Sequence, residues 1–169
     1  LPPPPPQVEA RAWQLLDASS GQVLAGQNQD ARLPPASLTK LMAAYLAFDA
    51  IERDKLELDD EFAVSAQAAA ASGARMFARE GQKIRVDDLL AALVVLSAND
   101  AALTLAQGMA GSEAEFVAAM NAQAQKLGLS NTRFLNVTGH AQDGHVSSAR
   151  DLTRLTSWLI ARFPQHYKR

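Results

Sequence analysis

The chain has 169 residues, which is long enough for one domain with its own hydrophobic core. Its apolar fraction of 48% is ordinary for a globular protein, and its net charge of −2 with scattered lysines and arginines argues against a nucleic-acid-binding surface. There is no cysteine, which excludes disulfides and thiolate metal sites, and no run of about 18 apolar residues that would span a membrane.

The chain begins with a proline-rich segment and a predicted β-hairpin. Residues 1–8 contain an unbroken proline run, a pattern that predicts an extended polyproline II tail outside the folded domain. Residues 12–16 and 22–25 are apolar-rich strand candidates, and the sequence Ala18-Ser19-Ser20-Gly21 between them is typical of a turn. These segments therefore predict a hairpin.

Helices account for most of the remaining pattern. A helix is predicted from Ser37 to about residue 50, because Pro34 and Pro35 precede it and no helix breaker follows. Residues 56–64 could hold a short strand, and the alanine-rich residues 66–73 have helical propensity. Further helices are predicted over residues 87–96, over 101–109, from a capping-box pattern at 112–115 to Gly128, and from Ser148 to about 161.

The sequence Ser37-Leu38-Thr39-Lys40 places a hydroxyl one helical turn before an amine. Positions i and i+3 of a helix lie on one face, about 5–6 Å apart at Cβ, so the Lys40 amine can reach the Ser37 oxygen. A nucleophilic serine needs a base, and the positive end of the helix dipole disfavours a protonated amine. The pattern marks Ser37 as a candidate nucleophile and Lys40 as its base, although a lone Ser-x-x-Lys is more often a cap followed by an exposed lysine.

A second motif strengthens that interpretation. The apolar segment 89–96 runs directly into Ser97-Ala98-Asn99, which alone would be an ordinary helix end. Ser-x-x-Lys and Ser-x-Asn are the first two of three motifs found in serine β-lactamases and penicillin-binding proteins, and here Ala98 occupies the middle position of the second.

The chain resembles the low-molecular-mass penicillin-binding proteins of the D-alanyl-D-alanine carboxypeptidase family. The similarity extends from about residue 10 to the end. The stretches that carry it are Leu16-Asp17-Ala18-Ser19-Ser20-Gly21-Gln22-Val23-Leu24, Pro35-Ala36-Ser37-Leu38-Thr39-Lys40-Leu41-Met42, Ser97-Ala98-Asn99-Asp100-Ala101, Met120-Asn121, Lys126-Leu127-Gly128-Leu129-Ser130-Asn131-Thr132-Arg133-Phe134 and Ser148-Ala149-Arg150-Asp151-Leu152.

The resemblance implies an α+β fold of the serine β-lactamase/DD-peptidase type, in which a helical subdomain packs beside a five-stranded antiparallel sheet. It implies a periplasmic carboxypeptidase that removes the terminal D-alanine from peptidoglycan stem pentapeptides and is inhibited by β-lactams. Ser37 would form the acyl-enzyme, Lys40 would act as base, and Ser97 would relay a proton to the leaving amine. Asn99 would bind the substrate amide or orient Lys40, and the backbone N–H of Ser37 would be one oxyanion donor.

The third family motif is missing from the sequence. Lys-Thr-Gly or a close variant is expected on a downstream strand, and neither Lys-Thr-Gly nor Lys-Ser-Gly occurs here. We therefore expect residues 9–169 to be the N-terminal part of a catalytic domain, nearly inactive alone and completed by the remainder of the same protein. The resemblance also implies that a signal peptide has been removed and leaves room for membrane association through sequence outside this chain.

Three other functions stay open. A D,D-endopeptidase would cut cross-links with the same atoms. A class A-like β-lactamase is disfavoured because its deacylating glutamate has no counterpart in residues 134–151. A scaffold that keeps the fold without activity would not need both motifs.

Residues outside the motifs are interpreted structurally. His140 and His145 share a loop rich in Gly and Asp, where a metal site is less favoured than a solvent-exposed loop. Asp151 is interpreted as a cap or a solvated residue, or as a partner of Arg150 or Arg154. No metal and no cofactor is expected.

Overall fold

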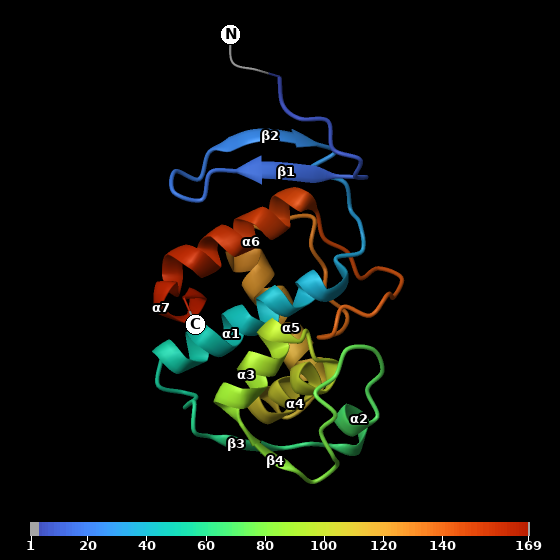
Figure 1. Cartoon of the computed structure of the whole chain (residues 1–169), viewed down its shortest axis with the longest axis vertical. Helices are drawn as coiled ribbons and strands as arrows, with labels where there is room; N and C mark the ends of the chain where they lie inside the picture. Colours follow the sequence, from blue (N-terminus) through green and yellow to red (C-terminus); the bar gives the residue numbers. More distant parts are fainter. Residues whose placement is uncertain (1–3, 169) are drawn as a thin grey trace.

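A helix that is buried along most of its length occupies the centre of the fold. The computed structural model describes residues 4–168, and in it α1 (Lys40–Glu52) crosses the middle of the molecule (Figure 1). Between Met42 and Phe48 only Leu46 is not fully buried, so the helix has no polar face over this stretch. Its neighbours are α3 (Val86–Val95), α4 (Asn99–Ala110), α5 (Glu113–Lys126) and α6 (Ala149–Arg162), which enclose the hydrophobic core with it.

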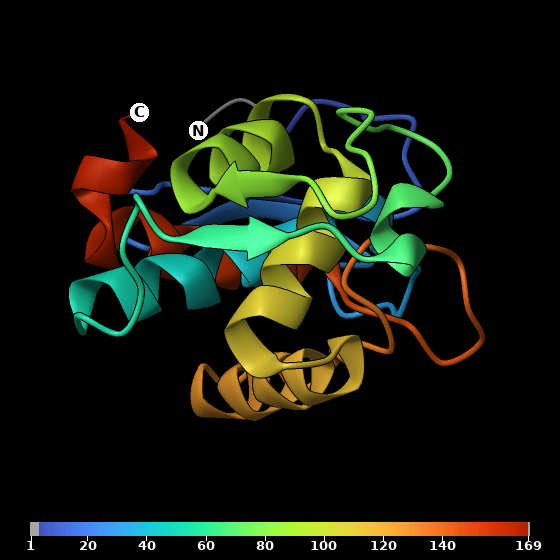
Figure 2. The same cartoon turned by 90° about the horizontal axis from the view of Figure 1, so that it is seen from below.

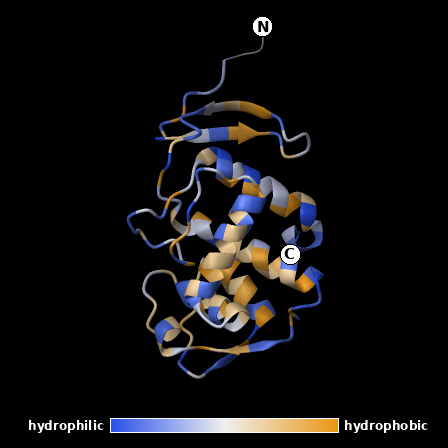
Figure 3. Cartoon of the chain, turned by 180° about the vertical axis from the view of Figure 1, so that it is seen from behind, coloured by the Kyte–Doolittle hydropathy of each residue, from blue (hydrophilic) through white to orange (hydrophobic). Residues whose placement is uncertain are grey.

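The predicted hairpin is confirmed and lies against one side of this helical core. Strands β1 (Trp13–Leu16) and β2 (Val23–Gln27) pair antiparallel, and α6 runs beside them (Figure 1). The Thr153 hydroxyl of α6 donates a hydrogen bond to Gln14 of β1, which joins the two elements. Apolar side chains remain exposed on the hairpin, namely Leu15, Val23 and Leu24, so the helices cover only part of its apolar surface (Figure 3).

A second, smaller two-stranded sheet lies at the other end of the molecule. Strand β3 (Glu61–Ala63) pairs antiparallel with β4 (Lys83–Arg85), and both pack near α4 and α3 (Figure 2). The strand expected within residues 56–64 is confirmed. β4 is not predicted from the sequence, because three residues carry too little alternation to mark a strand. The alanine-rich stretch forms only one helical turn, α2 (Ala66–Ala69), so propensity overstates the helix there.

The predicted helix ends agree closely with the structure. The Ser112 hydroxyl accepts from the backbone N–H of Glu115 at 3.1 Å, which confirms the serine half of the capping box, and Gly128 has a φ of +71° just past α5. Helix α4 begins at Asn99, two residues earlier than predicted. Beyond α6, Pro164 opens the short helix α7 (Pro164–Tyr167), because a first helical position needs no backbone N–H.

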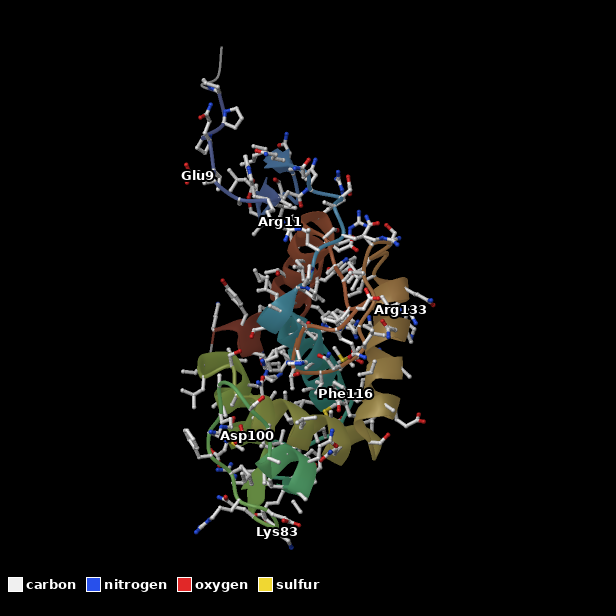
Figure 4. The ribbon with its side chains drawn as sticks, turned by 90° about the vertical axis from the view of Figure 1, so that its right-hand side faces the viewer. Glu9, Arg11, Lys83, Asp100, Phe116 and Arg133 are labelled. Carbon is white, nitrogen blue, oxygen red and sulfur yellow. The ribbon has the colours of Figure 1, made fainter. Side chains whose placement is uncertain are left out.

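The structure confirms the α+β class, with helices between two two-stranded sheets. Glu9 and Lys83 lie at opposite ends of the molecule (Figure 4). Residues 4–8 have no regular secondary structure, and residues 1–3 of the predicted tail lie outside the described part. Of the helices within residues 4–168, none has the length and apolar character that a bilayer crossing requires.

The contact between α4 and β3 depends on a glycine. A Cβ added to Gly108 would lie 2.2 Å from the Phe62 ring, so we expect Gly108→Ala to destabilise the fold by about 1–3 kcal/mol through overpacking. Chemical denaturation of both proteins measures the difference. Gly111→Asn is the matched control, because position 111 has open space and a φ of +85° that Asn tolerates. Equal stability of the Gly108→Ala and wild-type proteins would contradict this account.

Candidate active site

Ser37 lies in a tight turn immediately before the central helix. The turn is a 3₁₀ helix, η1 (Ala36–Thr39), and α1 continues from Lys40, so the predicted helical start is confirmed with a tighter first turn. Ala36 has a φ of +49°, a left-handed conformation that costs a residue with a Cβ about 1–3 kcal/mol. The result is an exposed Ser37 and Leu38 followed by the buried Thr39 and Lys40.

Lys40 is 5% exposed, which is unusual for a lysine. Its Nζ donates to the backbone carbonyl of Thr138 at 2.9 Å, and it forms no ion pair within residues 4–168. Burial therefore lowers the pKa of the Lys40 amine, because the charged form loses its hydration without gaining a counterion. The predicted neutral base is supported by burial and not by a neighbouring positive charge.

Ser97 lines the same groove as Ser37 and Lys40. It follows α3 with a φ of +53°, a second left-handed residue at the site, and is half-buried. Ser37, Lys40 and Ser97 all line an open groove of about 520 Å³. The rest of that groove is mainly apolar, with Pro35, Ala36, Leu38, Leu41, Ala44, Leu93 and Val94. The structure thus brings three of the four predicted site residues together.

Asn99 does not line this groove. As the first residue of α4 it donates from Nδ2 to the carbonyl of Ser72 at 2.7 Å, and its backbone N–H donates to Ala74 at 2.7 Å. It lines a neighbouring groove together with Thr138, the residue that accepts from Lys40. In this structure Asn99 therefore holds the loop after α2, and its roles toward substrate and Lys40 stay predictions.

A buried carboxylate next to Asn99 was not singled out from the sequence. Asp100 is 1% exposed, and its two oxygens accept from the backbone N–H groups of Met76 and Ala78, both at 3.0 Å. Between them Phe77 has a φ of +61° and is 74% exposed. The sequence signal was ambiguous, because an acid in the first turn of a helix is usually a surface partner of the dipole.

The loop that carries Thr138 packs directly on the turn that carries Ser37. Gly139 has a φ of +85°, and a Cβ there would lie 1.9 Å from the carbonyl oxygen of Ala36 and 2.9 Å from the backbone nitrogen of Ser37. Only a glycine allows this approach. The contact explains how residues 98 positions apart come to share one hydrogen bond at Lys40.

Two structural interpretations from the sequence need correction. His140 is exposed as expected, but His145 is 1% exposed and hydrogen-bonded, so it does not belong to a solvent-exposed loop. Asp151 is also buried, and it accepts from the backbone N–H of Asn131 and the hydroxyl of Thr132 instead of pairing with Arg150 or Arg154. Local sequence does not reveal burial that distant segments create.

We expect Asp100→Asn to loosen the loop around Phe77. An Asn side chain has one acceptor oxygen, so one of the two N–H groups of Met76 and Ala78 would face an amide donor. The expected loss of stability is about 1–3 kcal/mol, with faster amide hydrogen exchange at both residues. Asp88→Asn is the matched control, an exposed acid in the first turn of α3. Unchanged exchange at Met76 and Ala78 would show that Asp100 does not hold this loop.

Comparisons with known proteins agree with this geometry. D-alanyl-D-alanine carboxypeptidase DacC of Escherichia coli strain K12 is 42% identical over 168 residues, covering 96% of this chain and 42% of that protein. A D-alanyl-D-alanine endopeptidase of Pseudomonas aeruginosa is 39% identical over 142 residues, covering 83% of this chain and 44% of its own length. The chain thus spans about two fifths of the length of these relatives.

Solved structures match over nearly the whole chain. The D-alanyl-D-alanine carboxypeptidase DacD of Francisella tularensis superimposes with a TM-score of 0.97 at 33% identity, covering 99% of this chain and 41% of that one. Penicillin-Binding Protein D2 of Listeria monocytogenes in its ampicillin-bound form gives 0.84 at 34% identity, covering 96% and 66%. A family model for D-alanyl-D-alanine carboxypeptidases, peptidase family S11, matches residues 2–169, and the chain belongs to that family.

Proposed function

We propose that the protein is a serine-type D-alanyl-D-alanine carboxypeptidase that acts on the stem pentapeptides of peptidoglycan. The observation that carries the proposal is the groove shared by Ser37, Ser97 and a buried lysine that has no counterion among residues 4–168, in a chain of this family. Because the chain spans only part of its relatives, the proposal concerns the full-length protein. Its location in the periplasm, where peptidoglycan lies, is part of the proposal.

The chemistry begins with a proton transfer between two residues of the groove. A neutral Lys40 has two N–H groups and one lone pair, and donation to the Thr138 carbonyl leaves the lone pair free for the Ser37 proton. The Ser37 oxygen then attacks the carbonyl between the two terminal D-alanines. In the tetrahedral intermediate the negative oxygen is stabilised by backbone N–H donors, of which we assign one to Ser37.

Release of the first product returns the proton. Ser97, which lines the same groove as Lys40, relays the proton to the leaving amine, and the terminal D-alanine departs as Ser37 becomes acylated. Water then attacks the ester and regenerates Ser37. A β-lactam presents a strained amide to the same atoms and stops at the acylated stage, which agrees with the ampicillin-bound form of a relative.

The proposal is tested by product analysis on the full-length protein. A peptide ending in D-Ala-D-Ala should release free D-alanine, and Ser37→Ala should abolish the release because the acyl-enzyme cannot form. Ser19→Ala, which removes an exposed hydroxyl in the hairpin turn, is the control expected to keep the activity. Release that persists in the Ser37→Ala protein, or no release and no penicillin labelling by the wild type, would refute the proposal.

A D,D-endopeptidase is the second candidate, favoured by the similarity to the Pseudomonas aeruginosa endopeptidase. The bond cleaved has the same chemistry, so the distinction lies in the leaving group, a free D-alanine or a cross-linked peptide. Parallel assays with a pentapeptide and a cross-linked dimer separate the two. Rapid turnover of penicillin would instead favour a β-lactamase, and a protein that neither labels nor hydrolyses would favour a scaffold.

The role of Lys40 predicts a specific pH dependence. Because burial lowers the pKa of this amine, the neutral fraction should grow as the pH rises through a value below the ordinary lysine value of about 10.4. The rate of acylation by a fluorescent penicillin should follow that fraction. Lys40→Arg, which keeps the charge permanently, should slow acylation about 10²–10⁴-fold, while Lys126→Arg on the surface of α5 should not. An acylation rate independent of pH would exclude Lys40 as the base.

A further inference from the structure

His145 is a buried imidazole to which the proposed chemistry gives no role. It is 1% exposed, and its ring contacts that of Phe134 with centroids 5.9 Å apart. It makes two hydrogen bonds, one to Thr39 in the turn of the nucleophile and one to the backbone of Leu135. The first bond joins residues 106 positions apart, next to both Ser37 and Lys40.

The two hydrogen bonds define the tautomer of the ring. The backbone N–H of Leu135 can only donate, so Nδ1 of His145, at 2.9 Å, is the acceptor nitrogen. The single proton of the neutral ring then lies on Nε2, which donates to the Thr39 hydroxyl at 2.8 Å. A protonated ring would point a second N–H at the N–H of Leu135. The neutral form alone satisfies this environment, and burial lowers the pKa of His145 in agreement.

The loop that His145 anchors carries the acceptor for Lys40. Asn136 folds this segment on itself, because Oδ1 accepts from the Gly139 N–H at 2.8 Å and Nδ2 donates to the His140 carbonyl at 3.0 Å. The folded segment places the Thr138 carbonyl 2.9 Å from Lys40 and presses Gly139 onto the backbone of Ala36. His145 is the side chain that fastens the end of this segment to the turn between Ser37 and Lys40.

We propose that His145 is a positioning residue for acylation: in its neutral form, with the proton on Nε2, it holds the loop of residues 135–145 against Thr39 so that the Thr138 carbonyl and the dry environment of Lys40 are maintained. The proposal rests on the proposed function, since it concerns the rate at which Ser37 is acylated. The Thr39 hydroxyl shares this role, because it is the group to which His145 bonds. Its hydrogen bond goes to His145 and not to Ser37 or Lys40.

The expected consequence of losing this bond is a change in the basicity of Lys40. When the loop loosens, water reaches the amine and its pKa moves back toward the ordinary value, so less of it is neutral at a given pH. At a fixed pH below the pKa, the neutral fraction of Lys40 falls tenfold for each unit by which its pKa rises. We therefore expect the inflection of acylation against pH to move up by about one unit and the rate at pH 7 to fall about tenfold.

Other ionisable groups must be separated from this effect. Those nearest along the chain to the contacts of His145 are Lys40 beside Thr39, Arg133 beside Phe134, His140 and Asp143 on its own loop, and Asp151 at the start of α6. Within residues 4–168 none of them forms an ion pair with His145. His140→Gln is thus a matched control, an exposed histidine of the same loop.

The experiment measures acylation of the full-length protein by a fluorescent penicillin from pH 5 to pH 10. His145→Leu removes both hydrogen bonds, Thr39→Val removes one while keeping the shape of the side chain, and Thr39→Ser keeps the hydroxyl. The first two should move the inflection to higher pH, and Thr39→Ser and His140→Gln should retain the wild-type profile. The double variant Thr39→Val/His145→Leu should be acylated no more slowly than His145→Leu alone, because Thr39 acts through its hydrogen bond to His145.

The outcomes are distinguishable. If His145→Leu does not fold, Thr39→Val carries the test. A merely structural role would lower the unfolding midpoint and leave the inflection where it is, which would overturn the proposal. A wild-type protein that takes up no penicillin at any pH would overturn the proposed function instead, since the role of His145 is measured only relative to a wild type that is acylated.

Discussion

An amine removed from water without a counterion is the constraint on which the site depends. Within the described residues Lys40 has the Thr138 carbonyl as hydrogen-bond acceptor and no carboxylate as ion-pair partner. A buried ion pair would hold the amine in its charged form, which cannot act as a base, whereas a neutral carbonyl also accepts from an uncharged amine and favours the charged form much less than a carboxylate would. The packing of α1 in the core and the contact with the 135–145 loop leave Lys40 only 5% exposed.

Two residues that line the same groove have strained backbone conformations, which the surrounding packed elements must maintain. Ala36 and Ser97 both have positive φ, although neither is a glycine, and each conformation costs about 1–3 kcal/mol. Both follow or precede well-packed helices, α1 on one side and α3 and α4 on the other, and the buried Asp100 fixes the adjoining loop. The serine hydroxyls of the site are therefore carried by short turns, and the packed helices next to these turns hold them in place.

Sequence reasoning found the parts of this arrangement that are local. The helical start at Ser37, the hairpin and the serine cap at Ser112 depend on neighbouring residues, and all three are confirmed. The roles of His145, Asp100 and Asp151 depend on segments far away in the chain. The local sequence around a loop histidine, or around an acid in a first helical turn, is the same whether that residue is exposed or buried. The burial of these residues is therefore seen only in the structure.

The burial of Lys40 also makes the stability of the fold depend on pH. In the unfolded chain this lysine binds its proton up to a pH of about 10.4, whereas the folded state releases it at lower pH. Over that interval the unfolded state carries more protons, so the free energy of unfolding rises with pH and this contribution is lost as the pH falls through the folded pKa. Acidification thus removes both this stability and the proton-free amine that the proposed acylation requires.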